Sequence, residues 1–359
     1  MNMKRIALGA VSLAAATSTY AQSSVTLYGV VDAFVQYADG ADSETRVQSG
    51  GLNGSRFGVR GIEDVGGGIQ ALFTLEAGLN ADDGTVAQGG VFWGRQAFVG
   101  LASPYGQITL GRQYSSVYHA SNDFSAFINS AWGASTAVIG GFGGYEPVRG
   151  ASTATGSSTG LGGPARVNNS IKYESPSFSG LKVGALLGLA ENGASLKDNR
   201  TYDLYARYTS GPIDAIISYV DDQLDNPAAP SLLEAKTLTL GAAYNFGTFR
   251  VMGGYLRKER DDTADADGNA FWIGGDIRFD RHLLRAQYVN NSPDADDADT
   301  HVIGVGYQYD FSKRTAVYAS ITHFKNDRRP RWHSVVPTGM ATPADSDITE
   351  FVAGIRHSF

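Results

Sequence analysis

Residues 271–279 read Phe-Trp-Ile-Gly-Gly-Asp-Ile-Arg-Phe, and their side chains divide between two unlike faces. The apolar face carries Phe271, Ile273, Ile277 and Phe279. The polar face carries Gly274, Asp276 and Arg278. A period of two residues is typical of a β-strand with different surroundings on its two sides. Residues 238–246 alternate in the same way. A soluble β-sandwich also alternates, so the connections between strands must decide the architecture.

Short turns and long polar connections follow one another in strict order along the chain. The short turns are Asp64 to Gly68, Ala102 to Gly106, Ser175 to Gly180, Ser210 to Pro212, Phe246 to Thr248, Phe279 to His282 and Phe311 to Arg314. The long connections lie roughly at 38–54, 80–91, 113–165, 190–200, 221–235, 259–269, 291–299 and 325–346. Seven short turns between eight long connections imply about sixteen antiparallel strands. This rhythm predicts an all-β transmembrane barrel, whereas a sandwich would mix its connection lengths.

The composition agrees with this architecture and excludes several classes of site. The 359 residues contain no cysteine, which rules out disulfides, thiol nucleophiles and cysteine-ligated metals. Length alone suggests about two ordinary domains. Glycine accounts for 45 of the 359 residues, a larger share than the usual value of about 7 %. This excess indicates many turns. The formal charge of −7 lacks the excess of basic residues that is typical of nucleic-acid-binding proteins.

The first 21 residues predict a secretory signal that is removed on export. Lys4 and Arg5 precede an apolar stretch from Ile6 to Ala16, and small residues stand at Thr19 and Ala21. A membrane-spanning helix needs about 20 apolar residues, and this stretch is too short. We therefore expect one barrel domain over residues 22–359, with 27 basic and 36 acidic side chains and a charge of −9.

Over the mature length the chain resembles a known family, the sixteen-stranded trimeric general porins of the Gram-negative outer membrane, especially the beta-proteobacterial type. The matching motifs are Ser-Val-Thr-Leu-Tyr-Gly at 24–29, Gly-Ser-Arg-Phe-Gly-Val-Arg-Gly at 54–61 with Glu63-Asp64, Gly-Arg-Gln-Ala-Phe-Val-Gly-Leu at 94–101, Leu-Gly-Arg-Gln at 110–113, Asn-Asn-Ser-Ile-Lys-Tyr at 168–173 and the terminal Phe359. Each fragment is short, but their order and spacing together are specific.

The resemblance implies a third extracellular loop that folds into the barrel, a homotrimer, and contact with outer-membrane lipid and lipopolysaccharide. It also implies that the barrel-assembly machinery recognises the last strand, residues 351–359, whose terminal aromatic is Phe359. His357 interrupts the apolar face of that strand, where an aromatic residue is commoner.

The polar strand faces predict a basic lumen in an acidic protein. A barrel of this size encloses water, so polar inward side chains are expected. The inward positions carry eleven basic residues: Arg56, Arg60, Arg95, Arg166, Lys172, Lys182, Arg207, Arg250, Arg278, Arg285 and Arg356. They carry fewer acids: Asp32, Glu76, Glu174, Asp203, Asp214 and Asp276. Arginine suits an anion path because it stays charged and presents several donors.

The family resemblance places the basic wall of the pore constriction opposite the third loop. By motif match this role falls to Arg56, Arg95 and Arg166, with Arg60, Arg112 and Lys172 as secondary lumen charges. Arg112 lies on the apolar parity of its strand, so it can face inward only if a β-bulge intervenes. Each of these arginines could instead be a solvated lumen residue with little effect on conductance.

The longest connection, residues 113–165, corresponds to the third loop of the family. Its first part, Tyr114 to Trp132, is rich in aromatic residues, as a loop packed on a wall would be. Asp123 is the first candidate for an acid that faces the arginines, and Glu146 is the second. A turn residue bonding its own backbone is the alternative reading of Asp123.

Two local patterns imitate catalytic or metal motifs without their context. Residues 156–160, Gly-Ser-Ser-Thr-Gly, match a nucleophile elbow but lie in a low-complexity stretch. Residues 265–269 imitate part of a calcium loop but lack its bidentate Glu. They belong with Asp294, Asp296, Asp297 and Asp299 to an acidic loop surface that is solvated or bridged by divalent cations to lipopolysaccharide phosphates.

The function expected is therefore a passive diffusion channel for small hydrophilic solutes and inorganic ions that prefers anions. No catalytic residue, cofactor or resident metal is expected. A substrate-specific channel on the same fold is the first alternative, and a barrel enzyme, which needs a positioned Ser/His pair or paired acids, is the second.

Overall fold

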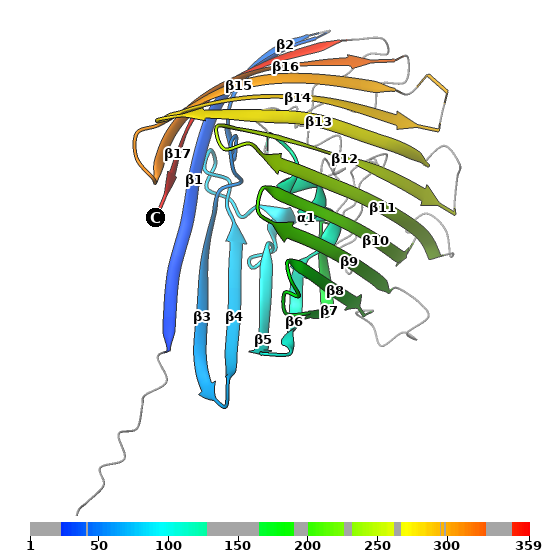
Figure 1. The fold of residues 1–359 in the computed structure, drawn as a ribbon. Helices are drawn as coiled ribbons and strands as arrows, with labels where there is room; N and C mark the ends of the chain where they lie inside the picture. The colour runs from blue at the N-terminus through cyan, green and yellow to red at the C-terminus, as the bar shows by residue number, and fades with distance from the viewer. Residues whose placement is uncertain are drawn as a thin grey trace, which may run out of the picture.

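The alternating segments form strands that pair mostly in sequence order and close into a cylinder, as a computed structural model of the chain shows (Figure 1). The structure describes residues 23–40, 42–127, 165–189, 200–225, 232–261, 267–294, 296–297, 299–327 and 347–359. The predicted signal segment, residues 1–21, lies outside these ranges. Within them, no helix is long and apolar enough to cross a bilayer.

All pairings between the strands are antiparallel. The first nine strands are β1 (Ser24–Asp39), β2 (Ser43–Ser49), β3 (Arg56–Gly66), β4 (Ile69–Gly78), β5 (Gln96–Ser103), β6 (Gly106–Tyr114), β7 (Arg166–Glu174), β8 (Leu181–Gly188) and β9 (Thr201–Ser210). The others are β10 (Ile213–Asp225), β11 (Leu232–Asn245), β12 (Phe249–Arg260), β13 (Gly268–Phe279), β14 (His282–Pro293), β15 (Thr300–Asp310), β16 (Thr315–Asn326) and β17 (Ile348–Ser358). Among the described residues, the connections also contain two short helices, η1 (Gln88–Gly90) and α1 (Ser116–Asp123).

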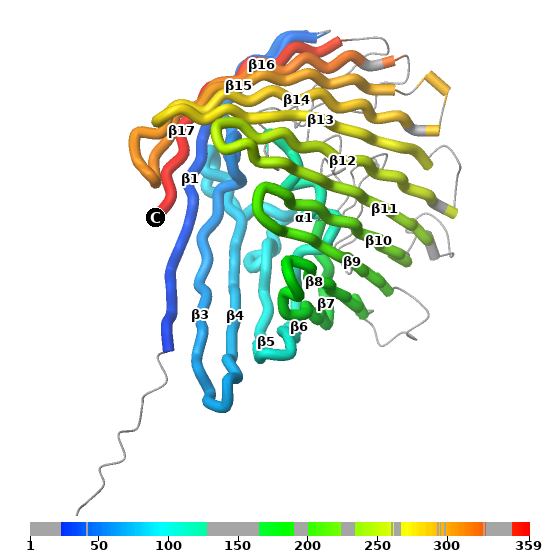
Figure 2. The backbone as a smooth tube through the Cα atoms, viewed as in Figure 1, coloured from blue at the N-terminus to red at the C-terminus, as the bar shows by residue number. Residues whose placement is uncertain are grey.

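The cylinder closes where the first strand meets the last (Figure 2). The register of β1 and β17 runs from Val30 opposite Ser358 to Asp39 opposite Thr349. The backbones of Gly29 and Phe359 exchange two further hydrogen bonds, of 3.2 and 3.1 Å. Closure satisfies the backbone groups that an open sheet would leave unpaired along these edges, and a barrel in lipid requires this.

The predicted sixteen-stranded barrel is confirmed, with a difference in its second strand and another at the predicted connection 221–235, where β10 and β11 stay paired as far as Asp225 opposite Leu232. β1 pairs with β2 along its second half and with β3 along its first half, so β2 and β3 are two parts of one interrupted strand. The predicted connection at 38–54 is therefore wrong over Ser43–Ser49. This segment is almost entirely polar and shows no alternation of apolar residues, so no local pattern indicates that it pairs with β1 as a strand.

All seven predicted short turns join neighbouring strands. In Figure 1 those between β9 and β16 lie at the left end of the strands. The two-residue turn between β13 and β14 places Asp280 at φ 51°, and glycine takes positive φ in the turn between β3 and β4. Antiparallel order places all seven turns at one rim, which we call the short-turn rim.

The two faces of the wall differ as the alternation predicts. Outward side chains are apolar and exposed, such as Leu204 at 55 %, Ile273 at 57 % and Ile303 at 56 %. Inward neighbours such as Asp203 and Gln287 are polar and buried. A continuous exposed apolar surface is unfavourable in water and is the normal outer face of a membrane barrel.

Candidate functional site

The first part of the loop after β6 lies against the inner faces of β9, β10 and β11. Ser115 caps α1 by accepting a hydrogen bond from the backbone nitrogen of Tyr118 at 3.2 Å. The backbone nitrogen of Ser116 then donates to the carboxylate of Asp203, an inward residue of β9, at 2.7 Å. These bonds fix the start of the helix to the wall.

The residues after α1 continue along the same wall towards β14. The indole nitrogen of Trp272 donates to the carbonyl oxygen of Phe124 at 2.9 Å. The side-chain oxygen of Gln287 accepts from the Ser125 hydroxyl and from the Ala126 backbone nitrogen, at 2.8 Å each. Phe127 is fully buried in a cluster of inward side chains, namely Phe34, Leu52, Ala126, Met252, Tyr318 and Val352. Residues 128–164, with Glu146, lie outside the described residues, so the path of the whole loop stays a prediction.

The three arginines predicted for the basic wall come together around one tyrosine. The guanidinium carbons of Arg166 and Arg95 lie 5.0 and 6.0 Å from the ring centroid of Tyr114. Tyr114 in turn stacks on Tyr118 of α1, with ring centroids 4.0 Å apart. Arg56 is within electrostatic range of Arg95 and Tyr114. Stacking of a guanidinium on an aromatic ring holds its plane in place.

Arg95 differs from the other two because its charge is neutralised inside the wall. Its Nε atom donates to Glu76 at 2.7 Å, and the two side chains are 7 % and 6 % exposed. Glu76 also accepts hydrogen bonds from Tyr28 at 2.9 Å and from Tyr114 at 3.3 Å. The ion pair therefore organises the wall, and its own charge is balanced.

Arg56 and Arg60 carry that charge on β3. The Nε atom of Arg56 donates to the carbonyl oxygen of Gly54 at 3.0 Å, and Arg60 lies over the ring of Tyr28 at 5.3 Å. Neither arginine has a carboxylate within 4.0 Å among the described residues. Both guanidinium groups therefore carry a positive charge that is not balanced nearby and that attracts anions in the lumen.

The other two secondary candidates are held more firmly. A register shift between Gly111 and Gln113 provides the bulge that Arg112 requires. The guanidinium of Arg112 is buried, donating to the Gly94 carbonyl oxygen at 2.7 Å and to Asn168. Lys172 lies 3.6 Å from Glu174, and its charge is partly balanced by this acid.

Asp123 faces an arginine, but not one of the three that the sequence analysis selected. It forms an ion pair of 2.6 Å with Arg207 of β9, which also binds Asp214 at 2.6 Å. The alternation placed Arg207 inside the barrel, but no pattern joins residues 84 positions apart. Asp123 thus belongs to the attachment of the loop to the wall.

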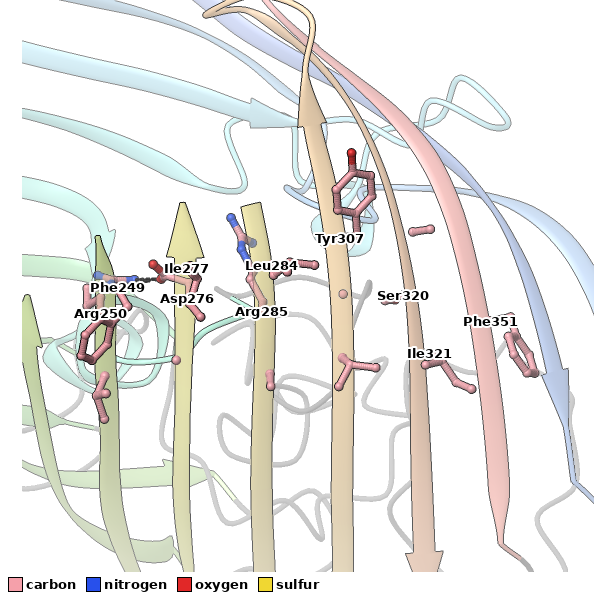
Figure 3. A pocket seen from close by; sticks show the side chains of 16 residues that line it. Phe249, Arg250, Asp276, Ile277, Leu284, Arg285, Tyr307, Ser320, Ile321 and Phe351 are labelled. Carbon is pink, nitrogen blue, oxygen red and sulfur yellow. Dashed lines mark hydrogen bonds and ion pairs between the residues drawn. The ribbon is translucent and has the colours of Figure 1, made fainter. Parts of the chain in front are cut away.

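A second group of basic side chains lines β12, β13, β14 and β17. Arg250 binds Asp276 at 3.2 Å (Figure 3), and Arg278 binds Asp310 at 2.6 Å. Arg356 donates to Asn53 at 3.0 Å. Asp32, the inward acid nearest to it in register, accepts from the backbone nitrogens of two residues, Leu52 and Asn53, at 2.9 and 2.8 Å. The acids Asp32, Asp276 and Asp310 are thus engaged in local bonds, whereas Arg356 has no carboxylate within 4.0 Å among the residues that the structure describes.

Phe359 ends the barrel on its outer face. Its side chain is 46 % exposed, and its ring packs close to Gly29, where an added Cβ would lie 2.3 Å from the Phe359 Cζ atom. This position explains how the last residue stabilises the closure. Its part in recognition during assembly stays a prediction.

The acidic surface near β13 and β14 is paired with an arginine. Arg257 contacts Asp294 at 3.0 Å and Asp267 at 4.0 Å. Among the residues that the structure describes, no three His, Asp or Glu side chains group so as to hold a metal ion. The imitation of a nucleophile elbow at 156–160 lies outside them.

Several residues of the site were missed by the sequence analysis. Tyr28 and Tyr114 support the arginines, and Trp272 and Gln287 hold the loop. The parity of their strands predicts that Tyr28, Trp272 and Gln287 face inward, which was the available signal. Their partners lie in distant parts of the chain, and no local pattern identifies them.

Comparison with known proteins places the whole chain among channel proteins. A family model described as "Gram-negative porin" matches residues 7–329. "Outer membrane porin protein 32" of Delftia acidovorans is 32 % identical over 379 residues, covering 99 % of this chain and 100 % of that protein. An outer membrane porin protein of Bordetella pertussis is 30 % identical over 419 residues, with the same coverage. A solved structure described as "Anion-selective porin from Comamonas acidovorans" superposes with a TM-score of 0.77 at 28 % identity, covering 94 % of this chain and 100 % of that one.

Proposed function

Because this chain belongs to the Gram-negative porin family, we propose that its lumen arginines make it a channel that prefers anions. The protein is an outer-membrane porin, a β-barrel for transport rather than an enzyme. Small hydrophilic solutes and inorganic ions cross it by passive diffusion, driven by their own gradients.

The observation that carries the anion preference is the imbalance of charge on the inner wall. Arg56 and Arg60 have no carboxylate within 4.0 Å among the described residues, whereas Glu76 is committed to Arg95. The two acids of β3, Glu63 and Asp64, lie at the short-turn end of that strand. A cation beside Arg56 and Arg60 therefore meets two guanidinium groups with no carboxylate of the described residues within 4.0 Å of either. A similar solved structure is described as anion-selective, which supports the proposal.

We assign distinct roles to the members of the basic wall. Arg56 and Arg166, with Arg60 beside them, attract the anion. Arg95 is a positioning residue, since its ion pair with Glu76 fixes the ring of Tyr114 on which Arg166 stacks. Arg112 and Lys172 contribute less because neighbouring groups hold them.

The test is the reversal potential of the reconstituted protein across a planar bilayer under a gradient of potassium chloride. A potential of the sign set by chloride is expected, and it should shrink in Arg56→Ala and Arg166→Ala. Arg257→Ala, which removes an arginine from the outer face, is the matched control and should leave the potential unchanged. A cation-preferring wild type would overturn the assignment.

We also propose that the channel is a homotrimer and that residues 1–21 are cleaved on export, as the family resemblance implies. Gel mobility before and after heating tests the first statement. The mass of the purified protein tests the second, which requires an N-terminus at Gln22.

A further inference from the structure

An apolar groove runs across the outer face of six neighbouring strands, β12 to β17. It has a volume of about 790 Å³. One large side chain from each strand borders it: Phe249, Ile277, Leu284, Tyr307, Ile321 and Phe351 (Figure 3). The floor consists of the small outward residues Gly275, Ala286 and Ala319. Gly275 pairs with Ala286 across β13 and β14, and Ala319 of β16 pairs with the bordering Tyr307 of β15. Small side chains between large ones leave a groove on the pleated outer surface that a single acyl chain can fill.

Aromatic side chains continue the groove to the short-turn rim. His282 lies between Phe279, with ring centroids 5.0 Å apart, and Tyr309, at 5.1 Å. Tyr309 contacts Phe311 at 5.2 Å. The Nδ1 atom of His282 and the hydroxyl of Tyr307 are 2.8 Å apart. Rings with one polar edge are typical of the level where acyl chains meet head groups.

Basic side chains crown this end of the groove. Arg281 lies in the turn after β13, and Lys313 and Arg314 lie in the turn after β15; all three are exposed. The two turns touch, since the backbone nitrogen of Asp310 donates to the carbonyl oxygen of Arg281 at 2.8 Å. The other five short turns contain no lysine or arginine. The charge is thus concentrated beside the groove.

Two acidic groups share this part of the rim, Asp280 and the terminal carboxylate of Phe359, whose neighbour Ser358 binds the Arg314 carbonyl oxygen at 2.8 Å. Asp310 is committed to Arg278 at 2.6 Å. Three cations against two anions leave the patch basic, with Lys313 and Arg314 adjacent in sequence.

We propose that the groove binds one acyl chain of an anionic glycerophospholipid whose phosphate contacts Arg281, Lys313 and Arg314. In membrane barrels the short turns face the periplasm, where the outer membrane exposes its phospholipid leaflet. From Arg281 to Ala286 the strand rises about 17 Å at roughly 3.4 Å per residue, so one lipid spans both features. Clustered lysine and arginine at a membrane surface attract anionic head groups.

The test is native mass spectrometry of the full-length, detergent-purified porin titrated with phosphatidylglycerol or with zwitterionic phosphatidylethanolamine. One phosphatidylglycerol per chain should be retained in preference to phosphatidylethanolamine. Arg281→Gln with Lys313→Gln and Arg314→Gln should weaken phosphatidylglycerol binding on the order of a hundredfold and abolish the preference. Ala319→Leu, which fills the floor, should weaken binding of both lipids.

Matched controls separate the site from general effects. Arg257→Gln with Lys325→Gln removes charge at the opposite rim, and Ala206→Leu enlarges a small outward residue of β9; neither should change lipid retention. Wild-type heat-modifiable mobility and unit conductance show that each variant is folded. Undiminished phosphatidylglycerol preference in the neutralised turns would overturn the proposal. Dissociation of the oligomer by Ala319→Leu would also overturn it, since the groove would then be a contact between subunits.

Discussion

Asp123 at the end of α1 and Arg207 on β9 form an ion pair of 2.6 Å that ties the loop inside the barrel to its wall. Both side chains are about a quarter exposed, and Arg207 shares its guanidinium with Asp214. The attachment is therefore electrostatic at one end and, at Phe124 to Phe127, made of hydrogen bonds and apolar packing.

Removing this pair should loosen the loop without abolishing the open state of the pore. In Asp123→Asn the coupling lost is about 0.5–1 kcal/mol, since the pair is partly solvated. We expect more frequent closures and a lower voltage threshold for closure in planar-bilayer recordings. Asp261→Asn, at the far end of β12, serves as the control. A threshold equal to that of the wild type would show that the apolar contacts alone hold the loop.

The buried pair of Arg95 and Glu76 should matter far more for stability. Glu76→Gln leaves a guanidinium buried without its counter-charge, which costs about 3–5 kcal/mol. The free energy of unfolding in urea, measured on the reconstituted barrel, should fall by this amount. Glu234→Gln breaks the exposed pair with Lys236 and should lower the free energy of unfolding far less, because water screens that pair. Equal losses in the two variants would contradict the structural role of Glu76.

The anion preference should depend on single charges in a graded way. An anion about 7 Å from a guanidinium in water gains about 0.6 kcal/mol, a factor of nearly three. Arg56→Ala should therefore lower the chloride-to-potassium permeability ratio about two- to threefold at about 0.1 M salt. Arg56→Ala with Arg60→Ala should lower it further. Reversal potentials provide the measurement, and a ratio unaffected by either variant would exclude β3 from the selectivity.

The same preference should weaken as the salt concentration rises. The Debye length falls from about 10 Å at 0.1 M to about 3 Å at 1 M, so the charges act over a shorter distance. With the concentration ratio across the bilayer held fixed, the reversal potential should be smaller at high salt. A value independent of salt would instead indicate selection by size or by tight binding.

The contact between Gly29 and Phe359 should be visible as a coupling energy. Alanine at position 29 would bring its Cβ to 2.3 Å from the Phe359 ring and 2.9 Å from the Arg56 carbonyl oxygen, so Gly29→Ala should cost about 1–3 kcal/mol. In a Phe359→Ala background the cost should be smaller. Unfolding in lipid without assembly factors measures this double-mutant cycle. An unchanged cost would place the strain at Arg56 alone.

The wall of the barrel could be predicted from the sequence because its pattern is local. Alternation at 271–279 and the seven short turns identify strands, faces and order without knowledge of any partner. β2 escaped detection because the segment is polar and its pairing with β1 is not encoded locally. The inward position of the arginines follows from parity. Their partners do not, since Arg95 meets Glu76 through the register of β4 and β5, and Asp123 meets Arg207 because α1 lies against the inner face of β9.

The seam between β1 and β17 makes the complete ring the smallest stable unit of this protein. A chain that ends before β17 has two bare edges and no way to satisfy them in lipid, so partial products cannot persist as smaller barrels. A nick in one of the connections between strands, by contrast, breaks a covalent bond but none of the ladder between strands. The two fragments would remain one wall, because its integrity depends on the circle of strands and not on the continuity of the chain.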